Sequence, residues 1–69
     1  MAIRFDDIGK RLKAFRLGSG LSAEEVAKRL GISRTALYRF EAGELAKIET
    51  LEKLSELLDV SVATLLGVV

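Results

Sequence analysis

The chain has 69 residues, which is enough for one small domain around a single hydrophobic core. It contains no cysteine, which excludes disulfides and a thiol nucleophile, and no histidine, the commonest general base and metal ligand. The net charge is only +1, but residues 1–40 carry nine basic and four acidic side chains (net +5), whereas residues 41–69 carry two and six (net −4). We therefore expect no catalytic residues, no metal and no cofactor, and one face that meets a polyanion.

The composition predicts an all-α protein. Apolar residues make up 49% and charged residues 30%, as in globular proteins, and proline is absent. No apolar run exceeds three residues, so neither a signal peptide nor a membrane span is expected, and the cytoplasm is the expected location. Residues 1–69 are expected to form one domain, either complete or as the N-terminal part of a longer chain.

The first predicted helix covers about residues 7–17, with Asp6 as its N-cap and Gly18 as its left-handed C-cap. Its apolar side is formed by Ile8, Leu12 and Phe15. Lys10, Arg11 and Lys13 are interpreted as a solvated face.

The second predicted helix begins with a capping box, in which Ser22 accepts from the Glu25 amide and Glu25 reaches back to the Ser22 amide. Its apolar side is formed by Val26, Ala27 and Leu30. Gly31 ends this helix, and only Gly31 and Ile32 separate it from Ser33, a second N-cap.

The third predicted helix covers about residues 34–42 and ends at Gly43. A loop over residues 44–48 leads to a fourth helix at about residues 49–58. Ser61 caps a short fifth helix over residues 62–66, before Gly67. The prediction is therefore a five-helix bundle without repeats or linkers.

Two short helices joined by a tight turn with glycine form a helix-turn-helix arrangement, here residues 23–42. With each residue advancing about 100°, one side of the third helix is apolar. It carries Ala36, Leu37 and Phe40. The opposite side carries Arg34, Thr35, Tyr38 and Arg39. Arginine pairs bidentately with guanine and threonine contacts thymine, so this side is a candidate for reading base edges.

Residues 21–43, which read LSAEEVAKRLGISRTALYRFEAG, resemble the Cro/lambda-repressor-type (Xre-like) DNA-binding domain. The closing stretch at residues 57–66, LLDVSVATLL, resembles it too, and the likeness extends over about residues 8–67. It implies a lambda-repressor-like fold, duplex DNA as the partner and the third helix in the major groove. The implied base-reading residues are Arg34, Thr35 and Arg39, with Tyr38 adjacent.

The resemblance also implies phosphate contacts. A homodimer is expected because one recognition helix offers few side chains to the bases. The candidates for phosphate are Ser22, Ala23, Ser33 and Lys47. Three positions depart from the family pattern: Ala23 replaces a common glutamine that contacts phosphate, Glu44 lies in a loop that is often basic or polar, and Asp59 replaces a common glycine. These departures predict weakened phosphate binding rather than a changed fold.

Arg16 and Glu41 stand beside apolar helix positions, and we interpret them as a partly buried ion pair between the first and third helices. The acidic pairs Asp6–Asp7 and Glu24–Glu25 open helices, so we interpret them as capping groups and not as catalytic carboxylates. Val68 and Val69 are left over from the predicted core. They indicate either a dimer contact or a continuation of the chain.

The expected function is sequence-specific binding of duplex DNA as a transcriptional regulator, with repression the expected outcome. The alternative is an antitoxin-like or other protein-interaction module. Salt-dependent binding to duplex DNA distinguishes the DNA-binding regulator from the protein-interaction module. The sequence specifies neither the operator nor an effector.

Overall fold

The computed structural model describes residues 4–44 and 47–68, which form five helices and no strands. The helices are α1 (Phe5–Ser19), α2 (Ala23–Leu30), α3 (Arg34–Glu41), α4 (Ile48–Leu58) and α5 (Val62–Leu66). The predicted five-helix all-α bundle is confirmed. Leu45 and Ala46 of the predicted loop, and Val69, lie outside the described residues.

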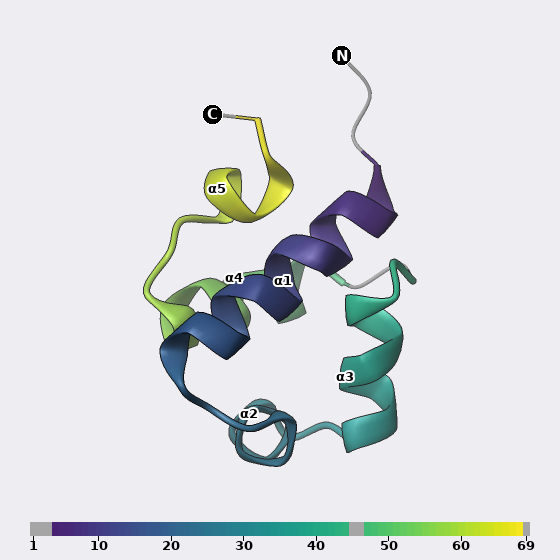
Figure 1. Cartoon of the computed structure of the whole chain (residues 1–69), viewed down its shortest axis with the longest axis vertical. Coiled ribbons are helices and arrows are strands. Elements are labelled where there is room, and N and C mark those ends of the chain that lie inside the picture. The colour runs from purple at the N-terminus through teal and green to yellow at the C-terminus, as the bar shows by residue number, and fades with distance from the viewer. Residues whose placement is uncertain (1–3, 45–46, 69) are drawn as a thin grey trace.

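The long helix α1 lies at the centre and packs against α3, α4 and α5 (Figure 1). The helix α3 packs between α1 and α2, and α5 lies at the opposite end of the molecule from α2. The innermost side chains come from all five helices: Leu12, Val26, Leu37, Leu54 and Leu65. None of the helices in the described part of the chain is long and apolar enough to cross a membrane.

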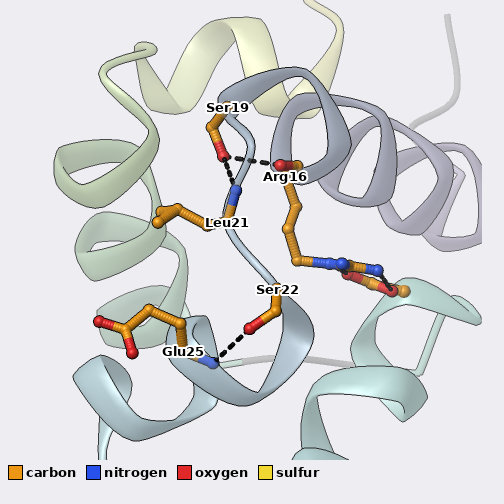
Figure 2. Close-up of polar contacts among 6 residues, drawn as sticks. Arg16, Ser19, Leu21, Ser22 and Glu25 are labelled. Atoms are coloured by element: carbon orange, nitrogen blue, oxygen red, sulfur yellow. Dashed lines mark hydrogen bonds and ion pairs between the residues drawn. The ribbon is translucent and has the colours of Figure 1, made fainter.

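The boundaries of α1 differ from the prediction. The helix begins two residues earlier, with Arg4 at the N-cap, and the Asp6 carboxylate pairs with Arg4 at 3.4 Å instead of capping. Gly18 is helical, and the left-handed C-cap is Gly20, with φ of 78°. The Ser19 hydroxyl donates to the Arg16 carbonyl at 2.6 Å and so supports the last turn (Figure 2).

The other boundaries lie within a residue of those predicted. The helix α3 ends at Glu41 with Ala42 as its C-cap, and α4 begins at Ile48. Asp59 adopts the left-handed conformation with φ of 57°, which aspartate tolerates better than most residues. The Ser61 hydroxyl accepts from the Thr64 amide at 3.0 Å, as its predicted role as a cap requires.

The close crossing of α1 and α3 depends on Gly9. A Cβ atom on this residue would collide with the carbonyl oxygen of Glu41 and lie 2.7 Å from that of Phe40. Both obstacles are backbone atoms, so they cannot rotate away as side chains do. The absence of a side chain at Gly9 therefore sets the distance at which α3 docks.

Replacing Gly9 by alanine is expected to destabilise the domain by about 1–3 kcal/mol, because α3 must move outward. Gly18→Ala is the matched control, since a Cβ there meets nothing within 4 Å and alanine favours the helix. Urea unfolding of both variants tests this expectation. Equal stabilities for the two variants would contradict it.

Candidate nucleic-acid interface

The helix α3 divides into a buried and an exposed side, as its sequence predicts. Leu37 and Glu41 are buried, and Ala36 and Phe40 are half-buried. The candidate base-reading side chains are all exposed: Arg34, Thr35, Tyr38 and Arg39. The structure thus brings these four together on the solvent side of one helix, without testing what they bind.

A tight turn fixes the angle between α2 and α3. Gly31 adopts φ of 70°, and its amide donates to the Lys28 carbonyl at 3.2 Å. The Ile32 amide donates to the Ala27 carbonyl at 3.0 Å, which completes a Schellman-type end to α2. The Ser33 hydroxyl then accepts from the Ala36 amide at 3.0 Å and starts α3. Three residues therefore separate two well-capped helices.

An ion pair between Arg16 and Glu41 joins the buried side of α3 to α1. The Arg16 Nε donates to Glu41 Oε2 at 2.6 Å and its Nη2 donates to Oε1 at 3.1 Å, a bidentate arrangement (Figure 2). The two side chains are only 9% and 5% exposed. The hydrogen bond to Glu41 raises the pKa of Arg16 although burial opposes it, so the guanidinium stays charged.

The predicted pair is therefore present, and it is more deeply buried than expected. Among the described residues, no buried side-chain polar atom lacks a hydrogen-bond partner. Arg16 is buried and directs its Nε and Nη2 to Glu41, so its guanidinium lies inside the domain and not on the exposed side of α3. The pair links α1 to α3.

The candidates for phosphate contact lie in different settings. The Ser22 hydroxyl is exposed and accepts from the Glu25 amide at 3.1 Å (Figure 2). The Ala23 side chain is buried, so its backbone N–H is the group left for phosphate. Ser33 and Lys47 are exposed at the N-caps of α3 and α4.

The predicted capping box of α2 is only half formed. The Glu25 carboxylate accepts from Arg29 Nε at 2.9 Å, one helical turn along. This pairing takes the place of the predicted bond from Glu25 back to the Ser22 amide. The first N–H groups of α2 have no partner within the helix, which is the usual state of a helix N-terminus and suits an anion.

Sequence reasoning did not anticipate that both arginines of the exposed α3 side have acidic neighbours. Arg34 Nη1 lies 3.9 Å from Glu24 Oε2, and Arg39 Nε lies 3.7 Å from Glu44 Oε2. The sequence partly indicates the Arg39 pairing, because Glu44 stands five residues after Arg39, just beyond the end of the helix. The approach of Glu24 to Arg34 depends on the angle between α2 and α3, which the sequence pattern does not specify.

The described residues contain no group of three or more His, Cys, Asp or Glu side chains placed to hold a metal ion. The chemistry that this surface offers is that of exposed guanidinium, hydroxyl and phenol groups together with the free amides of two helix N-termini. Such groups bind phosphates and base edges.

A family model described as helix-turn-helix matches residues 12–65, most of the chain and all of α2, α3 and α4. The chain belongs to this helix-turn-helix family. The resemblance to the Cro/lambda-repressor type is thereby confirmed. The helix-turn-helix domain is 41% identical over 62 residues to the HTH-type transcriptional regulator SinR of Bacillus licheniformis. The match covers 87% of this chain and 56% of that protein, so the chain spans about half the length of this relative.

Solved structures of DNA-binding and controller proteins have a fold similar to that of this domain. The domain is similar to the master regulator for biofilm formation SinR in complex with DNA, with a TM-score of 0.78 and 41% identity, over 86% of this chain and 97% of that one. It is also similar to the restriction-modification controller protein C.AhdI of Aeromonas hydrophila. Here the TM-score is 0.81 and the identity 29%, over 88% and 94% of the two chains.

Proposed function

We propose that this helix-turn-helix domain binds duplex DNA as part of a transcriptional regulator, with α3 in the major groove. The observation that carries the proposal is the exposed side of α3, where Arg34, Thr35, Tyr38 and Arg39 project from a helix whose other side is fixed to α1 and α2. Side chains on a rigidly held helix can be matched to base edges. A solved structure of SinR, to which this domain is similar, is in complex with DNA, which supports DNA as the partner.

The N-termini of α2 and α3 fit the phosphates on either side of the groove. Ser22 and the Ala23 amide open α2, Ser33 opens α3, and Lys47 precedes α4. Helix N-termini attract anions through their free N–H groups and the helix dipole. We propose that these four residues position the domain while the α3 side chains read the sequence, and that repression follows from occupancy of the operator in the cytoplasm. This role needs no catalysis.

Selection of bound duplexes from a random DNA pool tests the proposal. We expect a recurring motif and an affinity that falls about a hundredfold between roughly 50 and 200 mM salt, if four phosphates are contacted. A pool without enrichment, together with affinity that ignores salt, would favour the protein-interaction alternative. That alternative has some support, because a structure of SinR in complex with SinI protein is also similar to this chain.

We propose further that two copies bind a two-fold symmetric site. One α3 offers only four side chains to the bases, and Ala23 and Glu44 leave little phosphate contact. Two linked copies double the number of bases read, and their binding free energies combine, so the pair binds far more tightly than one copy. The α5 end, where Val68 is 52% exposed, lies away from α2 and suits a contact between copies (Figure 1).

Inserting about five base pairs, half a helical turn, between the two half-sites should weaken binding sharply. The insertion places the second recognition helix on the wrong side of the duplex. Gel-shift titration with the original and the lengthened site measures the effect, and a full-turn insertion of about ten base pairs is the control. Equal affinity for the original site and the half-turn insertion would indicate a monomeric reader or a dimer joined through flexible sequence.

A further inference from the structure

Each arginine on the exposed side of α3 is matched by one carboxylate from a flanking segment. Glu24, in the first turn of α2, reaches Arg34 at the start of α3 (3.9 Å), and Glu44, just after α3, reaches Arg39 near its end (3.7 Å). The only formal charges among the four candidate reading side chains are those of the two arginines. The exposed side of α3, taken together with these two carboxylates, is therefore close to neutral in the free protein, although residues 1–40 are strongly basic.

Both carboxylates are kept near their arginines by the backbone. The Glu44 amide donates to the Arg39 carbonyl at 3.0 Å, so the second residue after the α3 cap turns back toward the arginine. Glu24 and Arg34 line the same hollow between α2 and α3, together with Ala27, Lys28 and Ile32. The pairing of Glu24 with Arg34 thus depends on the angle between α2 and α3, and that of Glu44 with Arg39 on the turn that follows α3.

These pairs contribute little to the fold. The side chains are 62% and 81% exposed for Arg34 and Glu24, and 67% and 61% exposed for Arg39 and Glu44. Ion pairs at such exposure add little to stability because water screens them. Because water screens these pairs, binding rather than folding is the process that they can influence.

We propose that Glu24 and Glu44 set the DNA affinity of this domain low, by holding the reading arginines in the free protein and opposing the phosphates in the complex. This inference rests on the function proposed above and adds the residues that tune it. Because the cost applies to DNA of any sequence, the two carboxylates lower affinity without changing base preference. A single copy then binds weakly, and stable occupancy requires the paired sites of an operator.

Glu24→Gln and Glu44→Gln test the proposal, with Glu52→Gln on α4 as the control for net charge, since Glu52 is exposed and forms no ion pair among the described residues. Affinities for a selected duplex and a scrambled one are measured at about 50 and about 200 mM salt. We expect each variant to bind both duplexes about two- to fivefold more tightly at the lower salt, with their ratio unchanged. The gain in affinity shrinks at the higher salt. Because the two ion pairs are separate, the fold-gain of the double variant should equal the product of the two single-variant gains.

Unchanged affinity in both variants, or a gain equal to that of Glu52→Gln, would overturn the inference. Weaker binding would overturn it as well, since the carboxylates would then position the arginines for DNA instead of opposing it. Thermal melts check that the variants fold. Glu44 lies outside the helices, so Glu44→Gln still tests the proposal if Glu24→Gln destabilises α2. If the wild-type domain binds no duplex at either salt, the proposed function fails; if it binds and the variants match it, only this inference fails.

Discussion

Replacing Arg16 by alanine is expected to destabilise the domain by about 3–5 kcal/mol, because it leaves the Glu41 carboxylate buried without a partner. A single core of this size supplies only a few kcal/mol, so the variant should be largely unfolded or melt roughly 12–40 °C lower. Both oxygens of Glu41 bond to Arg16, so no other described side chain compensates the lost charge. Thermal melts followed by circular dichroism measure the effect.

Arg29→Ala is the matched control for Arg16→Ala. Arg29 also pairs with a glutamate, Glu25, at 2.9 Å, but the two side chains are about half exposed, so the loss should stay below about 1 kcal/mol. The double variant Arg16→Met/Glu41→Leu removes both charges and should recover much of the stability. Melting temperatures of Arg16→Ala and Arg29→Ala within a few degrees of each other would show that the buried pair does not hold α3.

Replacing Arg34 or Arg39 by alanine is expected to leave the fold intact and to reduce discrimination between the preferred and a scrambled duplex. Both side chains are about two-thirds exposed, so their removal costs the fold little. A bidentate contact between arginine and guanine is worth roughly 1–3 kcal/mol against the wrong base, which sets the expected loss for each variant. Competition titrations with the two duplexes measure the ratio.

Lys53→Ala is the control for lost positive charge, because Lys53 is exposed on α4. It should lower both affinities slightly and leave their ratio unchanged. If both arginine variants kept the wild-type ratio, α3 would not be the helix that reads the sequence. If only one of them lost discrimination, the other arginine would be assigned to phosphate.

The order of the helices and the exposed side of α3 were predictable because strong local signals encode them. Ser22, Ser33 and Ser61 all cap helices as predicted, and Gly31 supplies the left-handed turn. The 100° periodicity separated Leu37 from Arg34 and Arg39 correctly. Helix caps and periodicity depend only on residues close in the sequence, so they can be predicted without knowledge of the tertiary structure.

The features that were missed depend on contacts between segments. The glycines at positions 18 and 20 are both able to end α1, and the hydroxyl of Ser19 helps the helix to continue to the second. Gly9 is an ordinary helix position until α3 is packed against it. The pairing of Glu24 with Arg34 similarly requires the angle of the turn. The sequence pattern contains none of these distances.

The most direct test of α3 as the DNA-reading element is to map backbone amide chemical shifts of the domain on titration with a duplex selected from a random pool. We expect the largest changes at residues 33–39, at the first turn of α2 and around Lys47, with small changes in the rest of α4 and in α5 beyond any contact between copies. A scrambled duplex at the same salt should also shift the amides of the α2 N-terminus, with smaller changes along α3, because its arginines then meet phosphates without base-specific contacts. Changes confined to α4 and α5, with α3 unperturbed, would contradict the account.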